Sequence, residues 1–209
     1  VRKYYDDDAT IAYLQSNGFY VHVVDGYLPN FDYLAFSVGT APADGKGTQI
    51  DAEKQVVYLK QGSYVTAKHH FDINNDTDNA NKAESGASDN NGIGLNRYPF
   101  LSSYGNYSVY IYGMGAIDLT HLDRGERRGM VFSFANNIEV RGIKLINAPE
   151  WSFITYRCDG VTIKDVDIFG YRQNSDAFDI CNSKNVTVEG CFARTGDDLF
   201  AVKALGGDE

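Results

Sequence analysis

Residues 136–145, 159–168 and 184–193 read NNIEVRGIKL, DGVTIKDVDI and KNVTVEGCFA. Each stretch opens with two polar or glycine residues and then carries apolar residues at its third, fifth, eighth and tenth positions. These positions are Ile138, Val140, Ile143 and Leu145, then Val161, Ile163, Val166 and Ile168, then Val186, Val188, Cys191 and Ala193. The third positions are 23 and 25 residues apart, so the chain repeats a unit of about this length.

The apolar spacing within each unit is typical of two short β-strands with a break in phase between them, because alternate residues of a strand face opposite sides. Gly142 and Asp165 stand at the break. One such unit cannot bury its apolar face alone, whereas stacked units share a continuous core. The repeat therefore predicts an all-β parallel solenoid. Leucine-rich repeats have a similar period, but they need a ladder of leucines that this chain lacks.

Upstream of these units the pattern is weaker. A fainter copy places apolar residues at Val109, Ile111, Met114 and Ala116. Strands are also expected within 18–26 and 33–39, joined by the segment PNFD, and a strand, a glycine turn and a second strand within 55–65. We predict a β-helix over residues 46–209. Residues 1–45 are interpreted as N-terminal strands that form either a remnant of a β-sandwich or a cap.

The composition of the chain argues against nucleic acid as a partner and against a membrane-spanning helix. The net charge of −9 at pH 7 argues against nucleic acid, because binding a phosphate backbone requires a basic face. No stretch approaches the roughly 20 apolar residues of a membrane-spanning helix. Residues 72–92 are rich in Asn, Asp, Gly and Ser and are predicted to form a solvated loop, with calcium binding as the alternative.

The three cysteines, Cys158, Cys181 and Cys191, are too few for a disulfide scaffold. Two interpretations stay open. Cys181 and Cys191 could form a disulfide, or all three could be buried free thiols.

Four aspartates lie within residues 174–198: Asp176, Asp179, Asp197 and Asp198. Stacked strands of a solenoid are about 4.8 Å apart, and Asp176 precedes Asp197 by slightly less than one repeat. We therefore expect Asp176 to lie one rung below Asp197 and Asp198 at the same angular position. Like charges so close repel, which a structural protein would avoid but which acid–base catalysis exploits. The alternative is that each aspartate only caps a turn.

The segment NSDAFDI (174–180), followed by TGDDLFAVK (195–203), resembles the polygalacturonase family of pectin-degrading glycoside hydrolases, glycoside hydrolase family 28. The upstream segment INAPEWSFITYRCDGVTIKDVDI (146–168) is similar to the segment that precedes these motifs in the family. The resemblance is close over 131–205 and looser over 53–209. It implies a right-handed parallel β-helix and an inverting hydrolase that acts on pectin-type polysaccharide.

The resemblance also implies roles for individual residues. Asp197 would be the general acid, and Asp176 and Asp198 would position and deprotonate the attacking water. Asn174 would orient the cluster, Trp151 would stack on a sugar, and Lys203 and Arg172 would contact an anionic sugar. Trp151 could equally be a core residue, the two basic residues could be salt-bridge partners only, and Asp179 is either structural or functional. This mechanism needs no metal or organic cofactor.

The chain departs from the family pattern at several positions. Ser175, Ala177 and Leu199 replace the usual Thr, Gly and Cys. The later histidine of the family and its Arg-x-Lys clamp would lie beyond Asp198, and none of the four histidines of this chain matches that histidine. We therefore expect the chain to be the N-terminal part of a larger enzyme, with the remaining C-terminal part as a partner. We expect these residues alone to have little or no activity.

Other functions remain open at this point. A dextranase- or isopullulanase-like enzyme would share the β-helix and the carboxylates but cleave neutral glucans. A non-catalytic adhesin or carbohydrate-binding β-helix would use the aspartates as turn caps or calcium ligands. A pectate-lyase-like eliminase would need several calcium ligands and an arginine base, and no arginine is clearly placed for that role. The acidic composition and the solenoid favour an extracellular or periplasmic location.

Overall fold

The computed structural model describes residues 6–31, 34–36, 48–49, 55–67, 99–104, 108–123 and 128–204. One helix and 19 strands are assigned within these residues. Their bounds are α1 Asp7–Ser16, β1 Tyr20–Val24, β2 Tyr27–Phe31, β3 Leu34–Phe36, β4 Thr48–Gln49, β5 Gln55–Leu59, β6 Tyr64–Ala67, β7 Pro99–Tyr104, β8 Val109–Gly113, β9 Ala116–Asp118, β10 Arg128–Ser133, β11 Asn136–Arg141, β12 Lys144–Ile146, β13 Phe153–Tyr156, β14 Asp159–Lys164, β15 Asp167–Phe169, β16 Phe178–Cys181, β17 Lys184–Glu189, β18 Phe192–Arg194 and β19 Phe200–Lys203.

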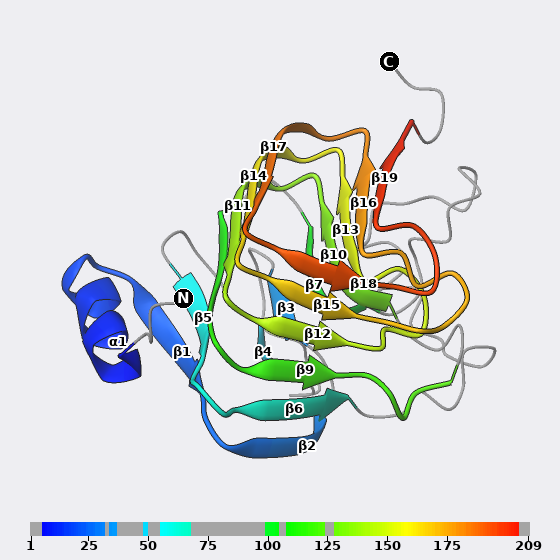
Figure 1. Cartoon of the computed structure of the whole chain (residues 1–209). Coiled ribbons are helices and arrows are strands. Elements are labelled where there is room, and N and C mark those ends of the chain that lie inside the picture. The colour runs from blue at the N-terminus through cyan, green and yellow to red at the C-terminus, as the bar shows by residue number, and fades with distance from the viewer. Residues whose placement is uncertain are drawn as a thin grey trace.

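The strands form three parallel sheets around one interior (Figure 1). Sheet A has the order β1-β5-β8-β11-β14-β17, sheet B the order β2-β6-β9-β12-β15-β18, and sheet C the order β4-β3-β7-β10-β13-β16-β19. The chain visits the sheets in the order A, B, C and then returns to A one rung further along, and we call one such circuit a coil. The predicted parallel solenoid is confirmed.

The repeat of the sequence is the repeat of the coils. β11, β14 and β17 begin at Asn136, Asp159 and Lys184, the residues that open the three sequence units. The apolar anchors are in register, with Ile138 opposite Val161 and Val161 opposite Val186. Equal spacing in sequence therefore becomes vertical stacking in the structure.

The predicted breaks in phase are turns with left-handed backbone. Gly142, Asp165 and Gly190 occupy the same place in successive coils and have φ angles of 80°, 54° and 65°. At Gly142 a Cβ atom would lie 2.1 Å from the carbonyl oxygen of Gly113. Glycine is therefore required there both by conformation and by close approach of the backbones.

The fainter copy was predicted one residue out of phase in its second half. Ile117, rather than Ala116, pairs with Leu145 and is fully buried. The extra residue lies before it, because three residues separate Tyr112 from Ala116, whereas two separate their partners Arg141 and Lys144. In the later coils the corresponding turn has two residues.

The interior is filled by ladders of apolar side chains. Phe153, Phe178 and Phe200 follow one another in sheet C, with ring centroids 6.1 and 6.2 Å apart. The four apolar positions of the second sequence unit are 0–1 % exposed. This continuous burial is the main source of stability for a structure whose coils cannot fold singly.

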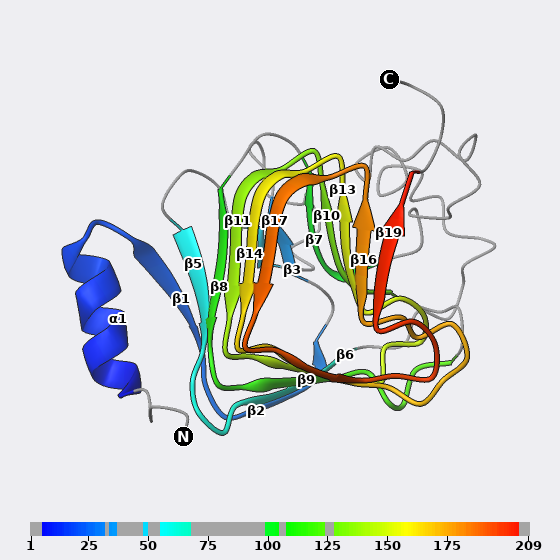
Figure 2. The same cartoon turned by 45° about the horizontal axis from the view of Figure 1, so that its top comes forward.

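Helix α1 was not predicted. Asp6 caps its N-terminus by accepting a hydrogen bond from the amide of Ala9 at 3.0 Å. Leu14 is buried against Val56 and Tyr58, which lie on the face of sheet A turned away from the solenoid interior. Figure 2 shows the helix beside β1 at one end of the stack.

The N-terminal strands belong to the same sheets as the later ones. The strand expected within 18–26 is β1, which pairs in parallel with β5, and β2 pairs in parallel with β6. The segment expected to be a linker, PNFD, instead contributes its first three residues to β2. The strand–turn–strand predicted within 55–65 corresponds to β5 and β6. The proposed boundary near residue 46 lies outside the described residues, and the domain division stays a prediction.

All three cysteines are free thiols, and Cys158 and Cys181 are buried. Burial raises the pKa of Cys158 to about 11 and that of Cys181 to about 12. The predicted loop at 72–92 lies outside the described residues. The helix in the described part of the chain, α1, is neither long nor apolar enough to cross a membrane.

Candidate functional site

The three corners of a coil differ in length. In the last three coils the connections from sheet A to sheet B are 142–143, 165–166 and 190–191, and those from sheet C to sheet A are 134–135, 157–158 and 182–183. The connections from sheet B to sheet C are 147–152, 170–177 and 195–199. Irregular backbone therefore accumulates at the B–C corner, and Trp151, Asp176, Asp197 and Asp198 all lie in it.

Asp176 and Asp198 lie on adjacent rungs at this corner. The amide of Ala177 donates a hydrogen bond to the carbonyl oxygen of Asp198 at 2.9 Å, and the amide of Ser152 donates to the carbonyl oxygen of Asp176 at 2.9 Å. The following strands continue this register, with Phe178 opposite Phe200. This stacking was expected from the length of the sequence repeat.

Ser175 and Gly196 join the two aspartate-bearing loops. The hydroxyl of Ser175 donates to the carbonyl oxygen of Arg172 at 2.6 Å and accepts from the amide of Gly196 at 3.2 Å. A Cβ atom on Gly196 would lie 2.2 Å from the carbonyl oxygen of Arg172. The loops thus pack backbone against backbone, which fixes the aspartates of one loop relative to those of the other.

Lys203 connects three coils beneath these loops. Its ammonium donates to Asp176 Oδ2 at 3.0 Å and also forms a short ion pair with Asp179 Oδ1. The same nitrogen lies 3.5 Å from the centroid of the Trp151 ring, a cation–π geometry. Register places Lys203 opposite Cys181, one rung above Asp179.

The two aspartates bound by Lys203 are buried, with exposures of 3 % for Asp176 and 0 % for Asp179. Burial raises the pKa of Asp179 to about 7, a shift that Lys203 opposes and the nearby charge of Asp176 reinforces. Burial lowers the pKa of Lys203, but the hydrogen bonds that its ammonium donates to Asp179 and Asp176 outweigh this effect, so the pKa is raised overall. The ammonium therefore stays charged while Asp179 can exchange a proton near neutrality.

Each of these aspartates keeps one oxygen without a partner. Asp176 Oδ1 and Asp179 Oδ2 are buried and accept no hydrogen bond from the residues that the structure describes. Buried carboxylate oxygens are normally satisfied. The Asp176 carboxylate therefore has unused hydrogen-bonding capacity at the corner that it shares with Asp198.

A second cation reaches the same indole. The guanidinium carbon of Arg128 lies 4.5 Å from the centroid of the Trp151 ring, and Arg128 pairs with the nearly buried Glu150 at 3.4 Å. Trp151 is half-buried. Its ring is thus fixed from below by the preceding coil and is engaged by Lys203 from a later one.

The predicted site residues fall into two groups. Asp176, Lys203 and Trp151 are in mutual contact through the ammonium, whereas Asp197 and Asp198 are exposed on the next rung. Asn174 is half-buried in the loop before Asp176 and has a φ of 66°. The side chain of Arg172 contacts neither group, because its guanidinium donates hydrogen bonds to the backbone carbonyls of Thr120 and Leu122.

Sequence reasoning did not place Arg128 or Glu150 in the site, and it left the role of Asp179 open. Arg128 belongs to the preceding coil, so only the register of sheet C brings it to Trp151, and Glu150, next to Trp151 in sequence, is its ion-pair partner. Asp179 carried a usable signal, because a charged residue in a strand flanked by Phe178 and Ile180 is seldom buried without a partner.

Comparison with known proteins gives a consistent result. Residues 40–207 match the family described as Glycosyl hydrolases family 28. A polygalacturonase of Juniperus ashei is 35 % identical over 82 residues, which cover 38 % of this chain and 16 % of that protein. An exopolygalacturonase of Zea mays is 33 % identical over 75 residues, covering 35 % of this chain and 18 % of that protein.

A fungal relative shows the same partial overlap. Endopolygalacturonase B of Emericella nidulans is 34 % identical over 74 residues, which cover 33 % of this chain and 20 % of that protein. The matched part therefore spans about a fifth or less of each of these relatives. Among solved structures, a protein from Parabacteroides merdae has a TM-score of 0.56 at 12 % identity, covering 93 % of this chain and 79 % of its own, which shows the fold.

Proposed function

Because the chain belongs to glycosyl hydrolases family 28, we propose that it acts in the hydrolysis of a pectin-type polysaccharide, galacturonan or a close relative, by inverting acid–base catalysis. The observation that carries this proposal is the stacking of Asp176 against Asp198 at the B–C corner, joined through the Ala177–Asp198 hydrogen bond of 2.9 Å. The names of the relatives, which are polygalacturonases, support galacturonan as the substrate class.

The proposed mechanism gives each carboxyl a separate task. Asp197 donates a proton to the glycosidic oxygen as the bond from that oxygen to the anomeric carbon breaks. Asp176 and Asp198 hold a water molecule and accept its proton as its oxygen attacks the anomeric carbon from the opposite face. One bond is formed and one is broken without a covalent intermediate, so the configuration at the anomeric carbon inverts.

The carboxyl groups given these tasks lie in different environments. Asp176 is enclosed and keeps Oδ1 unpaired, whereas Asp197 is exposed where a polymer can approach. Trp151, half-buried beside Asp176, is proposed to contact a sugar only with the part of its indole that Arg128 and Lys203 leave uncovered. We propose Asn174 as a further polar contact, because it is half-buried in the same loop as Asp176.

Substrate and chemistry can be tested together in the full-length protein. Parent and Asp197→Asn proteins are incubated with polygalacturonate and, separately, with dextran, and new reducing ends are measured. We expect cleavage of polygalacturonate that falls by about 10³-fold or more in Asp197→Asn. Asp8→Asn, an exposed change on α1, is the matched control and should keep full activity.

Each outcome has a distinct meaning. Cleavage of dextran alone would replace pectin with a neutral glucan as the substrate, and cleavage of neither by a folded parent would contradict the proposal. Proton NMR of the first product formed reports the anomeric configuration, and retention would overturn the inverting mechanism. We also propose an extracellular or periplasmic location, since a polysaccharide of this size stays outside the cell, and cell fractionation tests it.

A further inference from the structure

The ammonium of Lys203 has no free direction left for a substrate. An ammonium has three N–H donors. One is taken by Asp176 at 3.0 Å, one by Asp179, and the ring of Trp151 lies 3.5 Å away. The side chain is only 23 % exposed. A sugar carboxylate could bind Lys203 only by displacing a buried aspartate, which would leave that aspartate without a counter-charge.

The backbone holds Lys203 as firmly as its side chain is held. The amide of Asn182 donates to the carbonyl oxygen of Lys203 at 3.0 Å, and the parallel register sets Lys203 opposite Cys181. Asp179 is fully buried, and Trp151 is itself engaged by Arg128. The ammonium is thus fixed by elements of three coils, which is the arrangement of a support and not of a mobile substrate ligand.

The consequence of this support appears at Asp176. Lys203 binds Oδ2, so the carboxylate has one anchored oxygen and one buried oxygen, Oδ1, that accepts no hydrogen bond from the described residues. Without the ammonium the buried carboxylate would lose its ion-pair partner at Oδ2 and the contact that sets its orientation. A catalytic base displaced by about 1 Å loses on the order of 10²-fold in rate.

We propose that Lys203 is a positioning residue: held by Asp179 and the face of Trp151, it anchors one oxygen of Asp176 and thereby directs the other toward the attacking water. This inference rests on the proposed hydrolytic function and changes the role expected for Lys203 from the sequence. Asp179 acts in it as the second anchor of the ammonium, without contact to the substrate.

Kinetics separate positioning from substrate binding. In the full-length protein, Lys203→Met should lower kcat by about 10²-fold while KM changes by less than about threefold. A substrate-binding lysine would instead raise KM and leave kcat nearly unchanged. Lys184→Met removes an exposed lysine at the start of β17, in the same coil but in sheet A, and is the matched control, expected to retain parent kinetics.

A double substitution tests whether Lys203 acts through Asp176. If it does, adding Lys203→Met to Asp176→Asn should cause little further loss, because the group that Lys203 orients is already disabled. Additive losses would overturn the inference. Asp179→Asn should give an intermediate fall in kcat with KM retained, since the ammonium keeps one of its two carboxylates.

An activity-independent measurement uses the indole. Fluorescence from Trp151, isolated by subtracting the spectrum of a Trp151→Phe protein, should shift in Lys203→Met and stay unchanged in Lys184→Met, with far-UV circular dichroism confirming that each is folded. Identical Trp151 emission in parent and Lys203→Met would overturn the contact and the inference with it. A parent that cleaves no glycan overturns the proposed function, whereas an active parent in which Lys203→Met raises KM alone overturns only the role of Lys203.

Discussion

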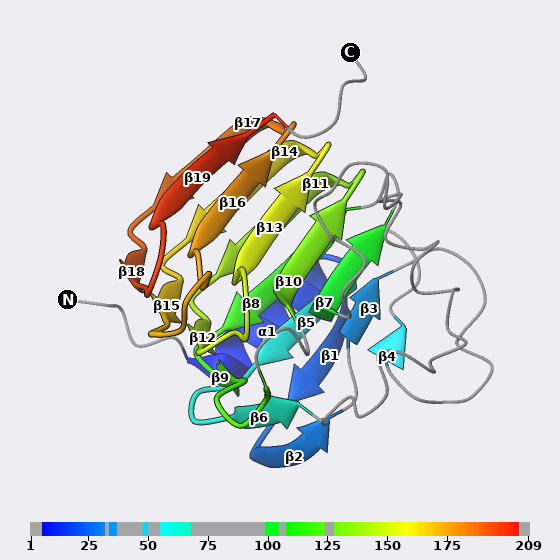
Figure 3. The ribbon, with the colours of Figure 1, turned by 90° about the vertical axis from the view of Figure 1, so that its right-hand side faces the viewer.

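The coil of residues 159–181 and the coil of residues 184–203 carry the same apolar pattern but have different surroundings. Val161 and Ile163 are 1 % and 0 % exposed, whereas their partners Val186 and Val188 are only half-buried. Among the described strands, β17, β18 and β19 each lie at the edge of a sheet. Figure 3 shows β19 at that edge, beyond β16 and β13.

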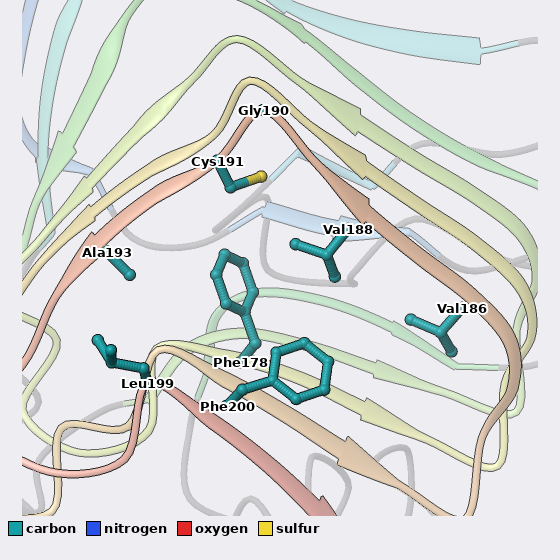
Figure 4. Close-up of a pocket in the computed structure, with 8 residues that line it drawn as sticks. All are labelled: Phe178, Val186, Val188, Gly190, Cys191, Ala193, Leu199 and Phe200. Carbon is teal, nitrogen blue, oxygen red and sulfur yellow. The ribbon is translucent and has the colours of Figure 1, made fainter.

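The edge coil bounds an open hollow. The hollow has a volume of about 510 Å³ and is lined mainly by apolar side chains, with Phe178 at its floor and Val188 and Phe200 on its walls (Figure 4). Phe200 is 50 % exposed, but Phe178, one rung below, is 4 % exposed. The sequence pattern thus decides which way a side chain points, and the neighbouring coil decides how deeply it is buried.

The candidate site lies across this difference. Asp176 and Asp179 belong to the enclosed coil, while Asp197 and Asp198 belong to the edge coil and are exposed. The enclosed coil holds Asp179 in a low-dielectric setting that raises the pKa of its carboxyl.

The largest contrast is expected in the phenylalanine ladder. Phe153→Ala should lower the free energy of unfolding by about 3–5 kcal/mol, because a cavity opens in a fully packed interior. Phe200→Ala, at the equivalent position of the edge coil, should cost about 1 kcal/mol. Urea denaturation of both variants measures the difference, and equal losses would contradict the contrast between the coils.

The buried carboxyl of Asp179 should make stability depend on pH. Its pKa is about 7 in the folded protein against an ordinary value of 3.8, so the folded state holds a proton that the unfolded state releases between these values. Stability from this group is therefore fully present below about pH 4 and is lost as the pH rises through 7, by roughly 2–4 kcal/mol.

Denaturation at a series of pH values tests this dependence. Asp179→Asn should remove the decline between pH 4 and 7, and Asp197→Asn, from the exposed coil, should leave it in place. A decline that survives Asp179→Asn would assign the effect to another group.

The turns between sheets A and B should show a smaller contrast. Gly142→Ala places a Cβ atom 2.1 Å from a backbone carbonyl at a φ of 80° and should cost more than about 2 kcal/mol. At Gly190 the nearest atom is the side-chain oxygen of Asp165, which can move, so Gly190→Ala should cost about 1 kcal/mol. Thermal melts of the two variants would disagree with this account if Gly190→Ala were the more damaging.

The smallest effect is expected at Gly160. Its φ of 75° is matched by Asn137 and Asn185 at the same position of the neighbouring coils, with φ angles of 57° and 54°. A Cβ atom there meets its nearest neighbour at 3.4 Å. Gly160→Asn should therefore change stability by less than about 0.5 kcal/mol in a thermal melt, since the loss of unfolded-state freedom offsets mild crowding. A loss of more than about 2 kcal/mol in the free energy of unfolding would show that this position does not accept asparagine in the coil of Gly160.

The solenoid could be predicted from the sequence because its determinants are local. The apolar pattern of each unit is sufficient to predict its two strands and the turn between them. Strands begin at Asn136, Asp159 and Lys184, as expected. Helix α1 was missed although its signals were present: Asp6 is an N-cap and Asp7 and Asp8 follow in the first turn. Its short apolar face, with Leu14, was overlooked beside the strand patterns that follow.

The candidate site could be predicted only in part. The stacking of Asp176 below Asp198 followed from the repeat length, since both lie at the same corner. The ion pair of Lys203 with Asp179 and its cation–π contact with Trp151 could not be predicted, because they depend on the side-chain directions of residues in three coils. For the same reason Arg172 was expected at the substrate, yet it holds the backbone at Thr120 and Leu122.

The unequal corners of the coil have a consequence for how such a protein can change. Two of its three corners have only two residues each in the last three coils, so an insertion there has little room, although one extra residue is accommodated before β9. The B–C corner already accepts connections of five to eight residues without disturbing the sheets. New specificity can therefore be grafted at this corner, loop by loop, onto an unchanged scaffold, and loops exchanged between relatives should transfer substrate preference while the fold is retained.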